Sequence, residues 1–268
     1  MIKVNGIIIE QNHFPDGSLL LKTDNMDKYY DPMRFEWHYE NDSELFTIIC
    51  LAKKYKERKV LYMPYCPHSR QDRVKRPEDT FTLKYFTEVI NSLGFEYVAI
   101  LDPHSNVCTA LIDRVVIKEA KEQIGNVIET IENFEDIVLY FPDYGAYKKY
   151  TDIFSLPYCY GKKVRDWETG KILGLEIENE MNIDLKGKTI FMIDDIISYG
   201  GSMFFGSKKL KELGVGDIYA YASHTENSIL DKDKGTLIKA LEDGTVKKLF
   251  TTNSIFTGQH EKITVMEV

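Results

Sequence analysis

Stretches typical of buried β-strands alternate with stretches of helical periodicity along most of this chain of 268 residues. Strand-like apolar runs are expected at residues 59–63, 97–101, 137–141, 189–193, 218–223 and 249–251. Helices are expected at residues 43–56, 82–93 and 203–213 and from residue 146 onward. Because a helix that links two neighbouring strands makes them parallel, this alternation predicts an α/β fold with mostly parallel, doubly wound sheets flanked by helices.

The ends of this pattern suggest how the chain is divided. Residues 4–10 and 18–22 are expected to form a β-hairpin, joined by the turn Pro15-Asp16-Gly17. Acidic and amide residues are dense from residue 118 to residue 133, which favours a surface helix near a domain junction. We therefore expect two domains, residues 1–117 and residues 118–268.

Composition limits the classes of partner. The net charge of −8 argues against non-specific binding to nucleic acid, which needs a basic surface. The four cysteines form no CxxC pair or metal-ligand spacing and are expected to be reduced thiols: Cys50, Cys66, Cys108 and Cys159. The sequence shows no signal peptide and no apolar run that spans a bilayer, so we expect a soluble, cytoplasmic protein with no membrane partner.

An adjacent pair of acidic residues, Asp194 and Asp195, follows the strand expected at residues 189–193. A Gly-rich turn from Ser198 to Ser202 comes next and leads into a helix. The backbone N–H groups and the dipole at a helix N-terminus favour an anion. The run therefore predicts a ribose-phosphate site, with the acid pair on the sugar hydroxyls and the turn on the phosphate. The alternative is an acidic loop after a core strand.

Polar residues directly follow several expected strands: Asp102, His104, Asp143, Asp194, Asp195 and His224. Ligands bind such sheets beyond the carboxyl ends of the strands, so these positions predict one functional rim. His104 and Asp143, with Asp113 further on, offer ligands for a Mg²⁺ ion that is also held by phosphates.

Two further segments carry clustered cations. Arg70, Arg73, Lys75 and Arg76 lie within seven residues after the expected strand at 59–63, and they suit a triphosphate; a solvated charged loop is the alternative. Residues 162–170 include Lys162, Lys163 and Arg165. They form either a loop that closes over a substrate or a plain hairpin turn, and the segment alone favours the hairpin.

Together, these residues resemble the ribose-phosphate pyrophosphokinase (PRPP synthetase) family, which has the type I phosphoribosyltransferase fold, from residue 14 to residue 255. The family's motifs are matched by Arg70-Gln71-Asp72-Arg73, Asp102-Pro103-His104-Ser105, Pro142-Asp143-Tyr144-Gly145, residues 194–202 and Thr252-Asn253-Ser254-Ile255. The resemblance implies two similar phosphoribosyltransferase-like α/β domains. It also implies transfer of the β,γ-diphosphoryl group of ATP to the anomeric C1 hydroxyl of ribose 5-phosphate, giving PRPP and AMP, with Mg²⁺ as cofactor.

The resemblance also implies roles for individual residues. The N-terminal domain would hold ATP through Phe14, Asp16, Arg70, Gln71, Asp72 and Arg73. The metal would be bound by His104, Asp113 and Asp143. The catalytic residues would be His104, Arg165 and Lys162 or Lys163. The C-terminal domain would hold ribose phosphate through Asp194, Asp195, Ser198, Tyr199, Gly200, Gly201 and Ser202. Phe14 and Asp16 match a hairpin that contacts adenine across a subunit interface, which implies a homo-oligomer.

Some positions depart from the family pattern. Tyr144, Ala146 and Tyr147 stand near Asp143, and Tyr199 stands within the phosphate loop, where the family has small residues. Aromatic side chains stack on bases, so the acceptor is alternatively a larger ribose 5-phosphoryl compound such as ADP-ribose, as in NAD-related metabolism. Neutral drift at solvent-facing positions is the simpler explanation. Two other classes stay open, a phosphoribosyltransferase that consumes PRPP and a non-catalytic subunit of a synthetase assembly.

Overall fold

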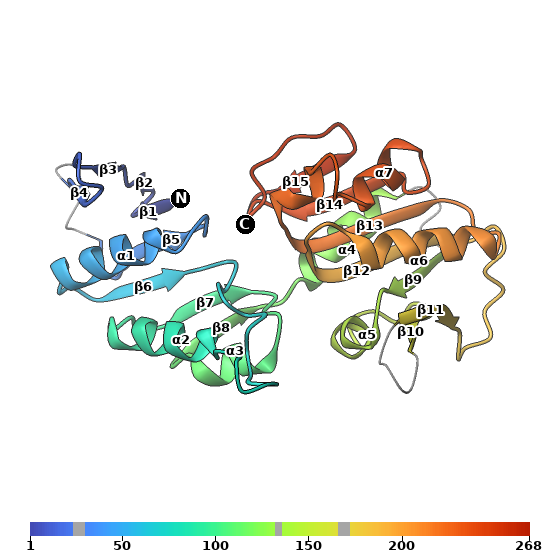
Figure 1. Cartoon of the computed structure of the whole chain (residues 1–268), viewed down its shortest axis with the longest axis horizontal. Coiled ribbons are helices and arrows are strands. Elements are labelled where there is room, and N and C mark those ends of the chain that lie inside the picture. Colours follow the sequence, from blue (N-terminus) through green and yellow to red (C-terminus); the bar gives the residue numbers. More distant parts are fainter. Residues whose placement is uncertain (24–29, 132–135, 166–171) are drawn as a thin grey trace. The chain divides into compact units, whose positions relative to one another are not determined.

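A computed structural model describes residues 1–23, 30–131, 136–165 and 172–268, without the side chains of residues 164, 165, 172 and 173 (Figure 1). The chain forms two compact units, Met1–Glu119 (unit 1) and Ala120–Val268 (unit 2). Each unit is built on its own sheet, so each is described separately.

Unit 1 contains a six-stranded sheet in the order β2-β1-β5-β6-β7-β8. Its parallel strands are β5 (Met33–Trp37), β6 (Lys59–Tyr62), β7 (Val98–Leu101) and β8 (Val115–Lys118). At its edge, β1 (Ile2–Val4) and β2 (Ile7–Ile8) run antiparallel. The strands from β5 to β8 lie side by side in chain order, as expected for successive right-handed crossovers.

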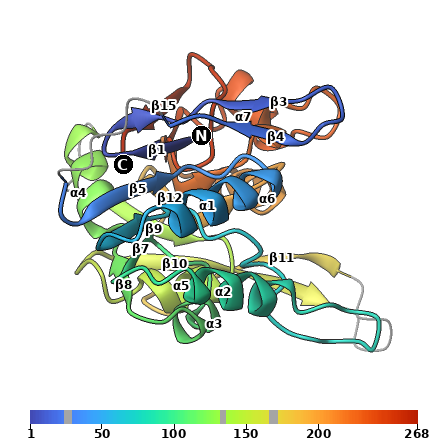
Figure 2. The same ribbon diagram turned by 90° about the vertical axis from the view of Figure 1, so that its left-hand side faces the viewer.

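Three helices connect the parallel strands of unit 1: α1 (Ser43–Lys54), α2 (Thr82–Ser92) and α3 (Asn106–Leu111). Successive right-handed crossovers place them on one face of the sheet (Figure 2). Alternate strand residues such as Phe35 and Leu61 pack there against Ile48 of α1 and Phe86 of α2. The helices therefore hold the loops that follow β6 and β7 at the carboxyl-terminal edge of the sheet.

The expected strand at residues 4–10 is wrong. β1 ends at Val4, and the chain turns at Asn5-Gly6 before β2. Both turn residues have positive φ, 52° at Asn5 and 80° at Gly6, as a type I′ turn requires. The hairpin around residues 15–17 is shorter than expected, with β3 (Gln11–His13) paired to β4 (Leu19–Leu21).

Unit 2 contains a seven-stranded sheet in the order β11-β10-β9-β12-β13-β14-β15. Its strands are β9 (Ile137–Phe141), β10 (Tyr158–Arg165), β11 (Ile172–Glu178), β12 (Thr189–Ile197), β13 (Ile218–Thr225), β14 (Lys248–Thr252) and β15 (Ile263–Met266). Only β11 is antiparallel to its neighbour among the strands described. The sheet is therefore mostly parallel, as the alternation of strands and helices predicts.

Helices cover both faces of this sheet: α4 (Lys121–Thr130), α5 (Tyr144–Tyr150), α6 (Gly201–Glu212) and α7 (Leu237–Glu242). The central strands are buried on both sides. On β12, Ile190 and Met192 join the core cluster that includes Leu210 of α6, whereas Phe191 and Ile193 join the cluster that includes Ile124 of α4. This double coverage explains the continuous apolar runs in the sequence.

The acid pair and His224 lie inside strands and not after them, contrary to the expectation. β12 continues to Ile197 because it pairs with β13 as far as the pair Ile197–Thr225. Asp194 pairs with Ala222, and His224 pairs with Ile196. Both strands are longer than their apolar runs, because pairing with a neighbour continues past the first polar residue.

Candidate functional site

Three carboxylates of unit 2 lie at the carboxyl-terminal ends of the adjacent strands β9 and β12. Asp143 follows β9 and is the N-cap of α5, where its Oδ1 accepts hydrogen bonds from the backbone N–H groups of Gly145 (2.9 Å) and Ala146 (3.1 Å). Asp194 and Asp195 lie near the end of β12, beside β9 in the sheet. The structure therefore brings Asp143 to the acid pair, as the rim of polar residues predicts.

The two members of the acid pair have different surroundings. Asp195 is buried, and its Oδ2 lies 3.2 Å from Nζ of Lys149 on α5. Asp194 accepts a hydrogen bond from the backbone N–H of Asp195 (2.9 Å). Burial raises the pKa of Asp194 well above its usual value, and the negative charges of Asp195 and Asp143 act in the same direction. Asp195 thus has a cation beside it, whereas the ionised form of Asp194 is destabilised by burial and by nearby negative charge.

The Gly-rich loop of residues 198–202, which the sequence predicts to bind phosphate, is held in place by the segment at the start of α7. The carbonyl oxygen of Tyr199 accepts hydrogen bonds from the N–H (2.8 Å) and hydroxyl (2.8 Å) of Thr236 and from the N–H of Leu237 (3.2 Å). Gly200, at a φ of 84°, is the N-cap of α6. The first N–H groups of a helix have no partner within it, so the loop presents donors suited to a phosphate.

Lys162 and Lys163 belong to the antiparallel hairpin of β10 and β11, which was the simpler interpretation of this segment. Nζ of Lys162 lies 2.7 Å from Oε1 of Glu178, and Nζ of Lys163 lies 3.8 Å from Oδ2 of Asp143. The side chain of Arg165 and residues 166–171 lie outside the described residues. The hairpin therefore brings at least one predicted catalytic cation to the edge that carries Asp143.

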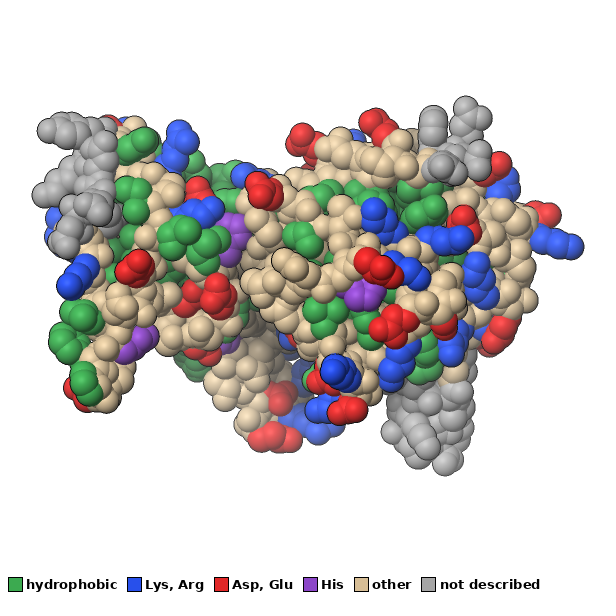
Figure 3. Space-filling model, turned by 90° about the horizontal axis from the view of Figure 1, so that it is seen from above, with side chains coloured by type: hydrophobic (Ala, Val, Ile, Leu, Met, Phe, Trp, Pro, Cys, Tyr) green, Lys and Arg blue, Asp and Glu red, His purple; other side chains and the backbone are tan. Residues whose placement is uncertain are grey.

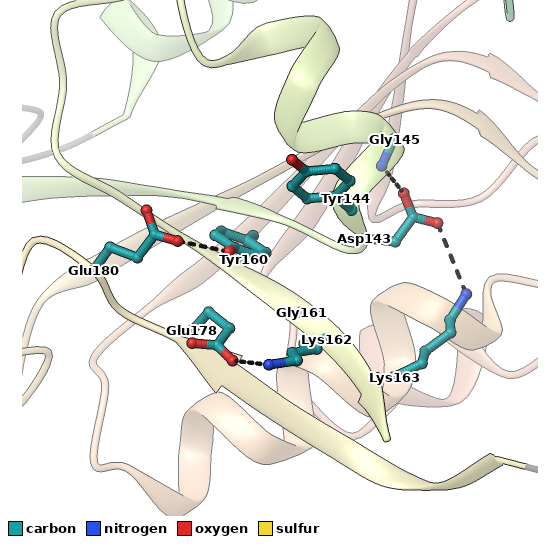
Figure 4. Close-up of a pocket in the computed structure, with 9 residues that line it drawn as sticks. All are labelled: Asp143, Tyr144, Gly145, Tyr160, Gly161, Lys162, Lys163, Glu178 and Glu180. Carbon is teal, nitrogen blue, oxygen red and sulfur yellow. Dashed lines mark hydrogen bonds and ion pairs between the residues drawn. The ribbon is translucent and has the colours of Figure 1, made fainter. Parts of the chain in front are cut away.

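A hollow of about 670 Å³ lies between the start of α5 and the β10–β11 hairpin (Figure 4). The residues that line it are Asp143, Tyr144, Gly145, Tyr160, Gly161, Lys162, Lys163, Glu178 and Glu180. It combines an aromatic wall with charges of both signs.

In unit 1, the loops after β6 and β7 bring Asp72, Arg73 and His104 together. The guanidinium of Arg73 donates two hydrogen bonds to the carboxylate of Asp72 (2.6 and 2.8 Å). These bonds lower the pKa of Asp72, and His104 contributes in the same direction. Asp72 is buried and Arg73 is exposed, so the carboxylate fixes a guanidinium that faces solvent.

The other predicted residues of unit 1 are more dispersed. Arg70 and Gln71 are exposed in the loop after β6, and Oε1 of Gln71 accepts a hydrogen bond from the hydroxyl of Thr82 (2.8 Å). Phe14 and Asp16 lie in the β3–β4 turn, where Phe14 is 49% exposed and the Asp16 carboxylate accepts two hydrogen bonds from Ser18. They are placed to contact a ligand from solvent.

Asp113 is not brought to His104. It lies beyond the last residue of α3 and before β8, where its N–H donates to Oδ1 of Asn91 (3.0 Å). His104 lies before α3 and after β7. The two residues therefore lie at opposite edges of the parallel sheet, and their placement does not support a shared metal.

His224 and Asp102 of the predicted rim are buried. Nδ1 of His224 lies 2.8 Å from the hydroxyl oxygen of Ser254. Asp102, at a φ of 44°, donates its N–H to the carbonyl oxygen of Lys118 (2.8 Å). These contacts give both residues a part in holding neighbouring segments together.

Sequence reasoning missed Lys149, Glu178 and Thr236, whose partners lie far along the chain. Lys149 and Asp195 are 46 residues apart. Lys149 follows Asp143 by six residues, a spacing with no known meaning on a helix. No motif marks these positions, since each contact depends on how separate helices, strands and loops pack together.

Replacement of Lys149 by methionine should lower the free energy of unfolding by about 1–3 kcal/mol, because a buried carboxylate loses its nearby cation. The Lys149 side chain is 25% exposed and that of Asp195 is 8% exposed, so water screens only part of this pair. Urea denaturation of both proteins at neutral pH measures the difference.

Lys148→Met is the matched control, since Lys148 is exposed on the same helix with its Nζ 4.8 Å from the centre of the Tyr144 ring. Its loss should cost about 0.5–1 kcal/mol or less. Equal losses in the two variants would contradict a stabilising role for the Lys149–Asp195 pair.

The donor set at Asp143 is small for a metal. Among the described residues, no group of three or more His, Cys, Asp and Glu side chains could hold an ion. Mg²⁺ in phosphate-binding sites takes only one or two carboxylates and completes its shell with phosphates and water. Asp143, whose Oδ2 accepts neither of the capping hydrogen bonds, fits this requirement.

The surface and helices add two observations. On the face shown in Figure 3, acidic side chains are interspersed with basic ones. Among the described helices, none is both long enough and apolar enough to cross a bilayer.

Curated relatives support the resemblance that the motifs indicate. The chain is 27% identical over 266 residues to a ribose-phosphate pyrophosphokinase of Saccharolobus solfataricus, covering 96% of this chain and 88% of the relative. A protein of the same name from Bacillus subtilis is 27% identical over 230 residues, covering 84% and 68% of the two chains. No family model matches the chain.

A solved structure shares the fold. The phosphoribosylpyrophosphate synthetase of Mycobacterium smegmatis superposes with a TM-score of 0.75 at 19% identity, covering 97% of this chain and 86% of the other. These findings confirm the predicted resemblance to ribose-phosphate pyrophosphokinases and the predicted fold class. The names of these relatives bear out the prediction of an enzyme that is similar to ribose-phosphate pyrophosphokinases.

Proposed function

We propose that this protein transfers the β,γ-diphosphoryl group of ATP to the anomeric C1 hydroxyl of ribose 5-phosphate, giving PRPP and AMP. One observation carries the proposal: the similarity to named pyrophosphokinases extends over 96% of the chain and so includes both units. A phosphoribosyltransferase that consumes PRPP needs only the acid pair and phosphate loop of unit 2. It leaves the Asp72–Arg73 pair and His104 of unit 1 without a role.

The acceptor half of the reaction is assigned to unit 2. The carboxylates of Asp194 and Asp195 accept hydrogen bonds from the ribose hydroxyls, and the loop from Ser198 to Ser202 binds the 5-phosphate. The carbonyl oxygen of Tyr199 accepts three hydrogen bonds, which anchor this loop. Such preorganisation lowers the entropic cost of holding the C1 hydroxyl in line with the β-phosphorus.

The donor half is assigned to unit 1, where Arg70, Gln71 and Arg73 bind ATP. Lys162 and Lys163, with Arg165, neutralise the charge that develops on the transferred group. Phosphoryl-type transfer depends on alignment and charge neutralisation, so no protein nucleophile is required. A non-catalytic subunit is disfavoured because both lysines and Asp143 are present.

We assign Asp143 of unit 2 and His104 of unit 1 as residues that would each offer a ligand to Mg²⁺ bound with ATP phosphates. When bound, this ion neutralises phosphate charge and fixes the triphosphate conformation. The position of Asp113, at the opposite edge of the sheet from His104, does not support it as a third metal ligand. A cytoplasmic location and a homo-oligomer, with Phe14 contacting adenine across a subunit interface, belong to the same proposal.

A second acceptor, ADP-ribose or a similar ribose 5-phosphoryl compound, is favoured by two exposed tyrosines. Tyr144 beside Asp143 is 54% exposed, and Tyr199 in the phosphate loop is 38% exposed. Exposed aromatic rings at a nucleotide site offer stacking surfaces for a base. Ribose 5-phosphate alone has no base to use them.

The test is acceptor-dependent release of AMP. The protein is incubated with ATP and Mg²⁺ and, in turn, with ribose 5-phosphate, ADP-ribose or no acceptor. We expect AMP only with an acceptor, and a phosphorus spectrum that shows a new diphosphate on C1. The acceptor with the higher kcat/KM decides between the two candidates.

Asp195→Asn serves as the variant control and should reduce acceptor-dependent AMP release by about 10- to 100-fold, because a charged hydrogen-bond acceptor is lost. AMP release that is equal with and without acceptor would identify simple hydrolysis and overturn the proposal. AMP in none of the mixtures would also overturn it.

A further inference from the structure

We propose that the hollow beside the β10–β11 hairpin binds an adenine-type nucleotide, with its amino-bearing base against Tyr144 and a phosphate at Lys162 and Lys163. The hollow measures about 670 Å³, and the described residues that line it all belong to unit 2. This volume suits a small ligand. The inference deepens the proposed function and rests on its second acceptor, because it names the site on unit 2 that would take a nucleotide and the kind of base that the site would prefer.

The aromatic side chains beside the hollow pack on one another. Tyr147 and Tyr160 stack with their ring centres 4.6 Å apart and their planes at 20°. The exposed Tyr144 packs on both, at 5.5 Å from Tyr147 and 6.1 Å from Tyr160. These contacts restrict the Tyr144 ring, which lowers the entropy that the ring loses when a base stacks on it, so Tyr144 is suited to a planar ligand.

The carboxylates near this wall determine which kind of base the hollow prefers. Oε1 of Glu180 accepts a hydrogen bond from the hydroxyl of Tyr160 (2.8 Å), and Oε1 of Glu178 accepts one from Lys162 (2.7 Å). An ionised carboxylate only accepts hydrogen bonds and has about four lone-pair sites, so each retains capacity. Such groups favour a base with an exocyclic amino donor over one with a carbonyl acceptor at that position.

Lys162 and Lys163 can bind the phosphate of the nucleotide. The side chain of Lys162 is 60% exposed and that of Lys163 is 33% exposed. Each ammonium has three donors and a single ion pair stated above, with Glu178 or Asp143, so it has further donors for an anion. Figure 4 shows Tyr144 and Tyr160 at one side of the hollow and Lys163 at another, as a base and its phosphate require.

The experiment is calorimetric titration of the full chain with AMP and with inosine 5′-monophosphate, which replaces the amino group by a carbonyl. An Arg73→Ala background weakens the nucleotide site proposed in unit 1. In that background we expect AMP to bind more tightly than inosine monophosphate. Tyr144→Ala should weaken AMP binding about tenfold through lost stacking, and Tyr144→Phe should retain it. Glu180→Gln should reduce the preference for AMP.

The matched control is Tyr85→Ala, because Tyr85 on α2 is 57% exposed, close to the 54% of Tyr144. It should leave AMP affinity unchanged. Undetectable AMP binding, or equal AMP affinity in Tyr144→Ala and its parent, would overturn the inference. These titrations contain neither ATP nor Mg²⁺, so their failure is separable from failure of the AMP-release assay.

Two sources of the nucleotide are distinguished by repeating the titration with ADP-ribose. Competition between AMP and ADP-ribose that is lost in Tyr144→Ala would assign the hollow to the acceptor's nucleoside. AMP binding without such competition would assign it to the adenine nucleotide of the donor or product. Both outcomes support a nucleotide site on unit 2.

Discussion

Asp194→Asn should raise the free energy of unfolding at neutral pH and at the same time remove use of the acceptor. The native carboxyl is half-buried and close to the charges of Asp195 and Asp143, which together with burial raise its pKa well above the usual value. Ionisation of this carboxyl therefore costs the folded protein stability, since the same ionisation is easier in the unfolded chain. The asparagine side chain keeps an oxygen that accepts the hydrogen bond from the N–H of Asp195.

The pH dependence follows from the sign of this shift. Because the pKa is higher in the folded state, the folded protein binds the proton more tightly than the unfolded chain does. The stability that the protonated group contributes is present below the ordinary pKa of about 3.9 and is lost as the pH rises through the raised value. The wild type should therefore lose stability across that window relative to Asp194→Asn, and the two curves should converge toward low pH.

Urea denaturation from about pH 4 to about pH 8, with a chelator present, measures this difference. Asp195→Asn is the matched control, because Asp195 lies 3.2 Å from Lys149 and its loss should destabilise the fold. Opposite signs at neighbouring positions would show that one carboxylate is stabilised and the other strained. A lower stability of Asp194→Asn at neutral pH would refute the prediction.

The two carboxylates also show which features of the site the sequence predicts and which it does not. The run from residue 189 predicted a buried strand, an acid pair and a Gly-rich turn into a helix, because each is a local pattern. It did not predict which carboxylate is paired. That depends on Lys149, which reaches Asp195 only because α5 and β12 pack together in unit 2.

Strand ends were the other weak point, for a similar reason. β12 includes the acid pair because β13 continues beside it as far as Thr225, and such pairing is not written in either strand alone. Charged residues interrupt the apolar pattern of β10 at Lys162 and Lys163, and Gly174 and Glu176 interrupt that of β11, so neither strand has the continuous apolar run that identified β9. The Asn5-Gly6 turn, by contrast, has a local signal, because an Asn-Gly pair is typical of a two-residue hairpin turn. The prediction of one strand over residues 4–10 did not use it.

Gly200→Ala should be the most damaging single-methyl change in the Gly-rich loop of residues 198–202. Gly200 has a φ of 84°, a conformation that costs an L-residue about 1–2 kcal/mol. A Cβ there would overlap Cβ of Leu237 and lie 3.2 Å from its backbone nitrogen. Relief of this overlap must move the loop away from α7, which weakens the hydrogen bonds from Thr236 and Leu237 to the carbonyl of Tyr199. We expect a total loss of about 2–4 kcal/mol.

Gly244→Ala separates the steric term from the backbone term, since Gly244 has a φ of 80° but a Cβ there meets no described atom within 4 Å. It should lose only about 1–2 kcal/mol. Urea denaturation gives both losses, and titration with ribose 5-phosphate tests the loop directly. We expect Gly200→Ala to lose this binding and Gly244→Ala to retain it, because only the first displaces the N–H donors at the start of α6. Equal stability losses in the two variants, or unchanged binding in Gly200→Ala, would show that contact with α7 does not hold the loop in its binding conformation.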